Sequence, residues 1–203
     1  SAPTVTLASS ANSMTEGDSA LTLTASLSVA TTGAVTVTLD TSGSAIEGTD
    51  YSNVSDITIA AGATTGTASF TVTDDSVYEG SEAATVTIGS VSGGSASAAG
   101  SGTSASITLA DNESAPTVNL SSSSASVTED GSAITLTATL SNIADEAVTV
   151  PITTSGTATE GTDYATISDI TIAAGATTGT ASITPTDDSV SEGIETLVVS
   201  LGT

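Results

Sequence analysis

The chain repeats itself along its length, and this repetition limits its fold more than any other feature. The stretch "SAPTVTL" at residue 1 returns as "SAPTVNL" at residue 114, and "DITIAAGATTGTAS" at residue 56 returns unchanged at residue 169. Every such offset is 113 residues, so the copies align without a gap. We therefore expect two tandem domains, residues 1–113 and 114–203, each folding around its own core.

Within each copy, apolar residues alternate with Ser and Thr at a period of two, which is typical of strands with one buried face. The second copy has no counterpart of the first copy's "VSGGSASAAGSGTSASITLADNE". The pattern predicts an all-β chain of two tandem seven-stranded antiparallel β-sandwich domains of immunoglobulin-like type, the second lacking its last strand. The expected strands of the first copy are residues 5–7, 21–27, 35–39, 57–59, 68–72, 84–88 and 107–109. Residues 89–102, rich in Gly, Ser and Ala, are expected to form a flexible hairpin loop.

The charge of the chain excludes several classes of function. Its 203 residues include 23 acids and no Lys, Arg, His or Cys, which gives a net charge of −23. Nucleic acid and anionic membrane surfaces attract basic proteins, so neither is an expected partner. No apolar run approaches the roughly 20 residues of a membrane span, so direct membrane insertion is not expected.

The same composition argues against an enzyme. Without His, Cys or Lys, most nucleophile and base chemistries are excluded. A glycosidase with paired carboxylates is the remaining alternative, but sugar sites usually offer aromatic platforms, and the chain has no Trp, one Phe and three Tyr. We therefore expect no catalytic residues.

The chain begins without an initiator Met or a signal peptide, so it is expected to be part of a longer protein. The absence of Lys and Arg also removes every trypsin-type cleavage site, which suits a protein outside the cell. We expect an extracellular or cell-surface location.

The acids gather in "TDDSVYEGSE" at residue 73, which returns as "TDDSVSEGIE" at residue 186. This stretch falls between the fifth and sixth expected strands, and other acids fall in loops that a sandwich can place at the same pole. Carboxylates that crowd together raise one another's pKa and oppose folding unless a cation joins them. Oxygen ligands without His or Cys suit Ca²⁺ better than Zn²⁺ or copper, so Ca²⁺ is the expected counter-ion.

The motifs "EGTDY" and, about two dozen residues later, "TDDSVYEGSE", with "LADNE" after the last strand, resemble the Calx-β domain family. That family occurs in sodium/calcium exchangers, large cell-surface proteins and bacterial adhesins. The resemblance implies a calcium site built from an acid of the first loop, the Asp of G-x-D-Y, the acids of D-D-x-x-x-E-x-x-E with one backbone carbonyl, and acids after the final strand. The ligands it implies in the first copy are Glu16, Asp50, Asp74, Asp75, the Val77 carbonyl, Glu79, Glu82, Asp111 and Glu113. Those it implies in the second copy are Glu129, Asp163, Asp187, Asp188, the Val190 carbonyl, Glu192 and Glu195.

Some acids have simpler interpretations. Asp56 and Asp169 precede strands and are expected to form turns, whereas Glu47 and Glu160 are expected to face solvent. The acidic run after the last strand of the first copy is short, "DNE", and the second copy has none. The second site is therefore expected to be incomplete.

Taken together, the sequence predicts a calcium-binding structural repeat of an extracellular adhesin, surface fibre or filament, in which Ca²⁺ stiffens the junctions between neighbouring repeats of the same chain. Two alternatives remain at this point. One is an adhesive module whose loops bind a ligand. The other is a self-polymerising filament subunit in which an identical subunit completes the second domain by strand addition.

Overall fold

The computed structural model describes residues 2–202, and these residues form strands and loops without a helix. No segment among them is a helix long and apolar enough to cross a membrane. The chain separates into two compact units: the first holds the chain up to Asp75 with Gly80–Asn112, and the second holds Ser76–Glu79 with the chain from Glu113 on. The predicted all-β fold is confirmed.

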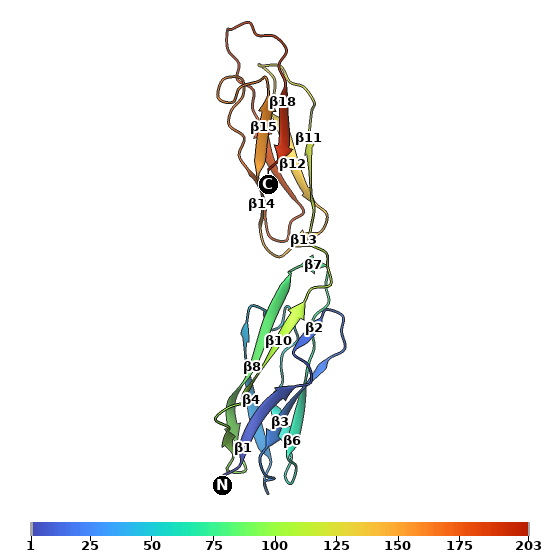
Figure 1. The fold of residues 1–203 in the computed structure, drawn as a ribbon, viewed down its shortest axis with the longest axis vertical. Helices are drawn as coiled ribbons and strands as arrows, with labels where there is room; N and C mark the ends of the chain where they lie inside the picture. The colour runs from blue at the N-terminus through green and yellow to red at the C-terminus, as the bar shows by residue number, and fades with distance from the viewer. Residues whose placement is uncertain (1, 203) are drawn as a thin grey trace. The chain divides into compact units, whose positions relative to one another are not determined.

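The first unit is a sandwich of two sheets (Figure 1). One sheet has the order β6-β3-β1-β9 and the other β2-β10-β8-β4-β5. The strands of the first sheet are β1 (Thr4–Ser9), β3 (Leu21–Leu27), β6 (Thr65–Phe70) and β9 (Ser97–Ala98). Those of the second are β2 (Ser13–Thr15), β4 (Val35–Gly43), β5 (Ile57–Ile59), β8 (Ser81–Ser92) and β10 (Ser104–Ala110). Neighbouring strands are antiparallel except for β1 with β9 and β2 with β10, which are parallel.

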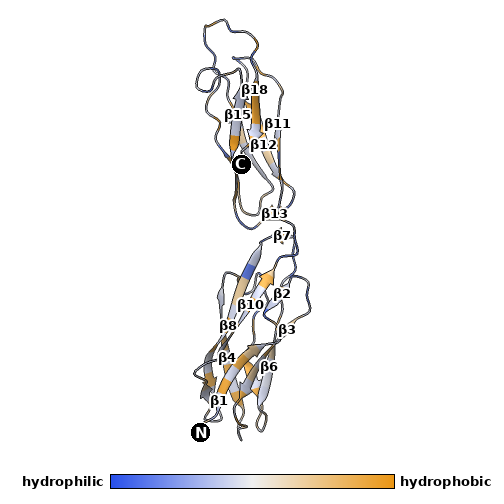
Figure 2. Cartoon of the chain, viewed as in Figure 1, coloured by the Kyte–Doolittle hydropathy of each residue, from blue (hydrophilic) through white to orange (hydrophobic). Residues whose placement is uncertain are grey.

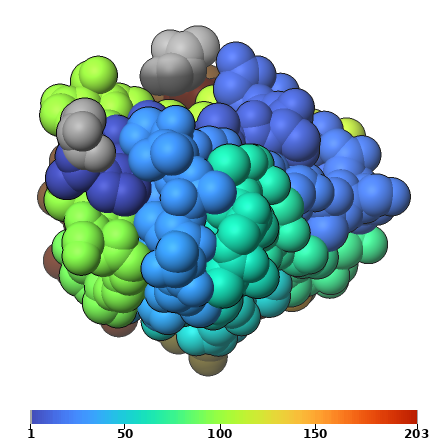
Figure 3. All heavy atoms as spheres, turned by 90° about the horizontal axis from the view of Figure 1, so that it is seen from below, coloured from blue at the N-terminus to red at the C-terminus, as the bar shows by residue number. Residues whose placement is uncertain are grey.

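All seven predicted strands of the first copy are present, and the short strands β2 and β9 were not predicted. The expectation of a loop over residues 89–102 is wrong in two places. Strand β8 continues to Ser92, and Ser97–Ala98 pairs with β1. Ser and Gly have low strand propensity, but pairing with an established neighbour outweighs that preference. Seen from below as spheres, segments of the first unit that are far apart in the sequence, coloured dark blue, light blue, blue-green and green, lie side by side (Figure 3).

The core of the first unit consists of the apolar residues that alternate along the strands. Leu23, Val37, Ile57 and Ile107 are fully buried, as the period of two predicts. Larger volume comes from Tyr51 and Phe70, whose rings stack with centroids 4.7 Å apart. Tyr51 belongs to the "EGTDY" motif, so the motif is anchored in the core and its Asp is held at the domain end.

The second unit repeats this plan with fewer pairings. It contains the sheet β11-β12-β17 and the strand pairs β14-β16, β15-β18 and β13-β7. Their bounds are β7 (Val77–Tyr78), β11 (Val118–Ser122), β12 (Ile134–Leu140), β13 (Ile143–Ala144), β14 (Val148–Val150), β15 (Ile152–Gly156), β16 (Ile170–Ile172), β17 (Thr178–Ile183) and β18 (Leu197–Leu201). By the 113-residue offset, β18 corresponds to β8, and β14 and β15 together correspond to β4.

Pro151 explains why one strand of the first copy is two strands in the second. It separates β14 from β15 and occupies the position of Thr38. In the first copy the register of β4 against β8 shifts between Thr38 and Leu39. A bulge is one of the few places in a sheet that accept proline, which has no N–H to donate, so the irregularity of the first copy tolerates the proline of the second.

Gly43 and Gly156 occupy equivalent positions at the ends of β4 and β15, with φ of 136° and 129°. A Cβ atom on Gly43 would overlap the carbonyl oxygen of Ala83, and one on Gly156 would overlap that of Thr196. These glycines therefore let two strands approach closely beside Glu82 and Glu195, the last acids of the two acidic stretches.

We expect Gly43→Ala to destabilise the first unit by about 3 kcal/mol. The positive φ at this position is unfavourable for any residue with a side chain, and the new Cβ atom would overlap the carbonyl oxygen of Ala83. For a domain of this size the melting temperature should fall by more than about 10 °C. Gly33→Ala is the matched control: a Cβ at Gly33 meets nothing within 4 Å, so its effect should stay within about 0.5 kcal/mol. Calorimetric melting checks both, and equal stability of the two variants would contradict the proposed role of Gly43.

Candidate metal sites

Among residues 2–202, three groups of carboxylates have ligand oxygens within 4.8 Å of one another. They are Glu16 with Asp111 and Glu113, Asp50 with Glu79 and Glu82, and Asp163 with Glu192 and Glu195. The last two groups are the same three positions of the repeat, separated by 113 residues. The structure thus assembles one carboxylate triad twice, from segments about 30 residues apart in sequence.

A hydrogen-bonded turn holds the Asp of each triad. In the first copy, Asp50 Oδ2 accepts from the Ile46 backbone N at 2.5 Å, and the Asp50 N donates to the Ile46 carbonyl at 2.9 Å. In the second copy, Asp163 and Thr159 make the same two contacts, at 2.5 Å and 2.9 Å. One carboxylate oxygen closes the turn, so the aspartate is oriented before any ligand arrives.

The turn is also joined to the strand that leads into the acidic stretch. The Thr73 N donates to the Asp50 carbonyl at 2.8 Å, and the Thr186 N donates to the Asp163 carbonyl at 2.9 Å. Tyr51 and Val72 form an isolated bridge beside this bond. These backbone bonds bring Asp50 and the "TDD" stretch together, although 23 residues separate Asp50 from Thr73 in the sequence.

In the remaining group, the carboxyl of Glu16 is partly buried and surrounded by other acids. The pKa of the Glu16 carboxyl is raised by burial and by repulsion from Asp111, Asp75 and Asp74, against the opposing effect of a hydrogen bond from the Asp75 backbone. Its Oε2 atom is buried and has no hydrogen-bond partner in the described part of the chain. Asp74 lies nearby, since Asn112 donates from Nδ2 to Asp74 Oδ1 at 2.8 Å and to the Glu16 carbonyl at 3.3 Å.

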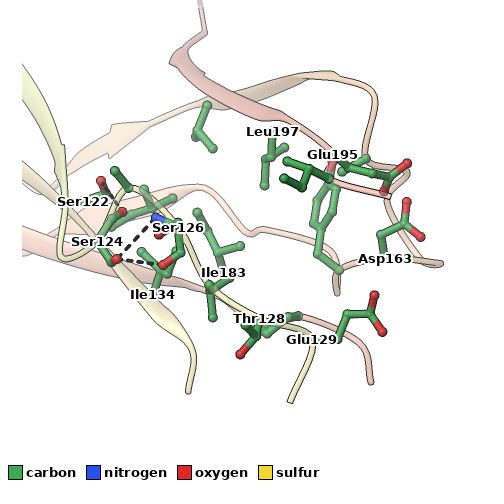
Figure 4. Close-up of a pocket in the computed structure, with 18 of the residues that line it drawn as sticks. Ser122, Ser124, Ser126, Thr128, Glu129, Ile134, Asp163, Ile183, Glu195 and Leu197 are labelled. Atoms are coloured by element: carbon green, nitrogen blue, oxygen red, sulfur yellow. Dashed lines mark hydrogen bonds between the residues drawn. The ribbon is translucent and has the colours of Figure 1, made fainter. Parts of the chain in front are cut away.

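The acids of the second copy are less enclosed. Partial desolvation and repulsion from Asp163, Asp188 and Glu129 raise the pKa of Glu192. The pKa of Glu195 is raised by desolvation, a hydrogen bond with Asp163, and repulsion from Asp163, Glu192 and Glu129. Figure 4 shows the carboxylates of Glu129, Asp163 and Glu195 at one end of a pocket in the second unit.

The structure thus brings together most, but not all, of the residues that the sequence predicts as ligands. Five predicted acids lie outside the three groups: Asp74, Asp75, Glu129, Asp187 and Asp188. Asp74 and Asp75 are close enough to Glu16 to raise its pKa, and Glu129 and Asp188 do the same to Glu192. Val190 is 60% exposed, and its N donates to Asp188 Oδ1 at 2.6 Å. Val77 lies in β7, which pairs in parallel with β13 within the second unit. The predicted acids of the first copy form two groups rather than a single cluster.

Sequence reasoning missed the role of Glu47, which was expected to face solvent. Glu47 is half-buried and accepts hydrogen bonds from Thr41 Oγ1 at 2.7 Å and the Val54 N at 2.6 Å. Its recurrence as Glu160 was a signal that could have identified it, but Glu160 is exposed. Asp56 and Asp169 were expected to form turns. The structure gives each of them a different contact: its carboxylate accepts a hydrogen bond from the backbone of a distant strand, at Leu39 and Ile152.

The family comparison agrees with this arrangement. The model of the Calx-β domain matches residues 1–113 and again residues 111–203, which together span the whole chain. The chain belongs to the Calx-β family. Calx-β domains are calcium-binding domains rather than enzymes. The family that the sequence motifs predicted is therefore confirmed.

Solved Calx-β structures are also similar to the chain. The crystal structure of CBD12 from CALX1.2 has 19% identity and a TM-score of 0.46, and covers 98% of this chain and 79% of that one. The apo-form Calx CBD1 domain has 18% identity and a TM-score of 0.45, and covers 54% and 99%. A two-domain protein from Bacteroides fragilis NCTC 9343 has 11% identity and a TM-score of 0.41, and covers 91% and 84%. A comparison with curated protein sequences found no match.

The raised carboxyl pKa values predict how stability depends on pH when divalent metal is removed. Glu16, Glu192 and Glu195 bind their protons more tightly in the folded state than at the ordinary value of 4.5. Their protonation therefore stabilises the fold fully below pH 4.5, and this contribution is lost as pH rises through the raised folded-state values. Melting in EDTA should give a higher melting temperature at pH 5 than at pH 7.

The Glu16→Gln variant provides the comparison for this pH series. It removes one titrating group of the first unit, so the slope of melting temperature against pH should be shallower than in the unmodified chain. A melting temperature in EDTA that falls steadily from pH 7 to pH 5 would contradict the assignment.

Proposed function

We propose that this Calx-β pair is a calcium-binding structural module of an extracellular repeat protein. The observation that carries the proposal is the repeated triad: Asp50, Glu79 and Glu82 converge in the first copy, and Asp163, Glu192 and Glu195 converge in the second. Because the two triads come from one repeated sequence, what supports the proposal is the convergence itself: segments about 30 residues apart place three carboxylates within 4.8 Å of one another. Like charges so close together oppose folding unless a cation lies between them.

The donor set suits calcium. All the grouped ligands are carboxylate oxygens, and the 203-residue chain offers no Lys, Arg or His to neutralise them. Ca²⁺ accepts six to eight oxygens in flexible geometry, whereas Mg²⁺ requires a nearly ideal octahedron. The buried, unpartnered Oε2 of Glu16 is a second indication, because a buried charged oxygen is costly unless a cation or a donor satisfies it.

The residues that would hold the ion in the first copy are the triad of Asp50, Glu79 and Glu82 and the group of Glu16, Asp111 and Glu113. Asp74 and Asp75 lie beside Glu16 and would complete its neutralisation. In the second copy the residues would be Asp163, Glu192 and Glu195, with Glu129 and Asp188 close enough to repel them. Bound calcium would supply positive charge and convert this repulsion into attraction.

Calcium bound by Asp111 and Glu113 would also act on the connection between the two repeats. They lie in the covalent connection between the repeats, directly before the "SAP" that opens the second copy. An ion held by these acids and Glu16 would reduce the freedom of the connecting segment and so stiffen the chain from one repeat to the next. In the extracellular location that we propose, sites of this kind would work at 10⁻⁴ to 10⁻³ M Ca²⁺, as is typical of extracellular calcium modules.

Isothermal titration calorimetry with calcium tests the sites themselves. Asp163→Asn with Glu195→Gln should abolish the heat of the second-copy site and leave the first-copy sites intact. Calcium at a hundred times its dissociation constant should stabilise a site by about 2.7 kcal/mol, which raises the melting temperature of a small domain by roughly 10 °C or more.

Glu146→Gln is the matched control for this titration, since Glu146 is an exposed acid of the second copy outside every carboxylate group. It removes one charge and should leave binding unchanged. A melting temperature equal in calcium and in EDTA would refute calcium binding, and equal heats from the double variant and the unmodified chain would refute the second-copy assignment.

The stiffening of the connection has a separate test. Spin labels on one exposed residue of each repeat should show a broad distribution of distances in EDTA and a narrower one in calcium. Asp111→Asn with Glu113→Gln should keep the distribution broad in calcium. If calcium binds by calorimetry but does not narrow the distribution, the module binds calcium without acting on the junction.

A further inference from the structure

The first unit gathers acids that no basic side chain can neutralise. The chain has no Lys, Arg, His, Trp or Gln, so the nitrogen atoms of its side chains all belong to asparagines. These are Asn12, Asn53, Asn112, Asn119 and Asn142. Figure 2 shows the strands of the first unit mostly white to orange, with a hydrophilic section in blue near the start of β8, where the acidic stretch ends. An asparagine beside this stretch can supply N–H groups to its carboxylates.

Asn112 is placed in this way. Its Nδ2 atom donates to Asp74 Oδ1 at 2.8 Å and to the Glu16 carbonyl at 3.3 Å. Asp74 belongs to the acidic stretch, Glu16 follows β2, and Asn112 itself follows β10. One amide with two N–H groups thus joins segments that are 38 and 96 residues away from it in the sequence.

The carboxylate of Asp74 lies against the turn that carries Glu16. A Cβ atom on Gly17 would be 3.7 Å from the carboxylate carbon of Asp74 and from both of its oxygens. The same turn holds the carboxylate of Asp18, whose Oδ2 accepts a backbone N–H bond within the turn at 2.8 Å. Asp74 is also among the acids that raise the pKa of Glu16. The Asn112 amide offsets part of this repulsion, because a hydrogen bond to a carboxylate favours its charged form.

The identity of residue 112 decides whether this donor exists. The preceding residue, Asp111, accepts from the Gly80 backbone N at 2.9 Å, and a backbone donor remains whatever the side chains are. The donor of Asp74 belongs to a side chain instead. The Asn112→Asp substitution keeps nearly the same shape, but it presents an oxygen where the amide presents its hydrogens, and it adds a negative charge.

We propose that the Asn112 amide takes the place of a cation in the metal-free first unit, where it compensates Asp74 and holds the acidic stretch against the turn of Glu16. Asn112 is then a positioning residue, which acts on the site through Asp74 and needs no contact with an ion. It also sets how strongly the stability of this unit depends on calcium, because the ion and the amide compensate the same charge. This last step rests on the calcium binding proposed above.

Calorimetric melting of the full chain in EDTA tests the metal-free state. Asn112→Asp removes the donor and adds a carboxylate beside Asp74, so the melting temperature of the first unit should fall by roughly 5 °C or more below that of the unmodified chain. Asn112→Ala removes the donor without adding charge and should give an intermediate value. The transition that Gly43→Ala lowers identifies the first unit.

Asn12→Asp is the matched control. Asn12 is an exposed asparagine of the same unit, and the substitution adds the same charge. Its melting temperature in EDTA should stay within about 3 °C of the unmodified chain, as expected for a surface substitution.

Calcium separates charge compensation from a hydrogen bond that serves structure alone. With calcium bound, the ion compensates Asp74, so the loss of melting temperature caused by Asn112→Asp should shrink to less than about half of its value in EDTA. Calcium should therefore raise the melting temperature of Asn112→Asp by more than it raises that of the unmodified chain. A purely structural hydrogen bond would be missed equally in both conditions.

Monovalent salt gives a measurement that needs no calcium. Raising NaCl in EDTA from about 0.05 M to about 1 M shortens the Debye length to about 3 Å, so the loss caused by Asn112→Asp should fall by roughly half. Failure of the calcium proposal would abolish the recovery in calcium and leave this salt dependence in place. The two failures are therefore distinguishable.

Three results would overturn the proposal. The first is an Asn112→Asp chain that melts at the same temperature as the unmodified chain in EDTA. The second is a loss that salt leaves unchanged, which would make the amide an ordinary structural hydrogen bond. The third is a loss that persists undiminished in calcium although calorimetry shows that calcium binds, which would mean that Asn112 does not set the calcium dependence.

Discussion

The structure depends on one electrostatic constraint: 23 carboxylates fold together with no basic side chain to neutralise them. Ordinary domains relieve this repulsion with surface ion pairs, and this chain has none to form. It instead places acids at the end of a sandwich, where backbone hydrogen bonds orient individual carboxylates and the remaining oxygens stay close enough to share a cation. The raised pKa values of Glu16, Glu192 and Glu195 express the same strain.

The strand framework makes this concentration of charge possible. The apolar residues of the strands bury a core of small aliphatic side chains, and in the first unit this core includes the stacked rings of Tyr51 and Phe70. Asp50 directly precedes Tyr51 in the chain. The packing of Tyr51 in the core therefore also fixes the position of the Asp50 carboxylate beside the core. Glycines at equivalent positions of the two copies, Gly43 and Gly156, let the strands approach beside the last acid of each stretch. Stability of the core and geometry of the site are thus linked through adjacent residues.

The two copies show how one repeat can assemble the same triad with different strand pairing. Nine strands form the two sheets of the first unit, whereas the described strands of the second unit form one three-stranded sheet and three strand pairs. Pro151 lies at the position where the first copy's register shifts, and it divides one strand into β14 and β15. The carboxylate triad nevertheless forms at the same three positions in both copies, so it does not depend on the longer pairings of the first copy.

The sequence by itself determined the repeat, the sandwich class, the seven main strands of the first copy and which acids are candidate ligands. Each of these follows from local pattern: a period of two, an exact offset, and charge confined to particular loops. Only the tertiary structure decided how the acids divide into groups, that Glu47 supports a turn, and that residues 89–92 continue β8. These properties depend on which distant segments become neighbours, and a pattern along one segment contains no information about the side chains that folding brings against it.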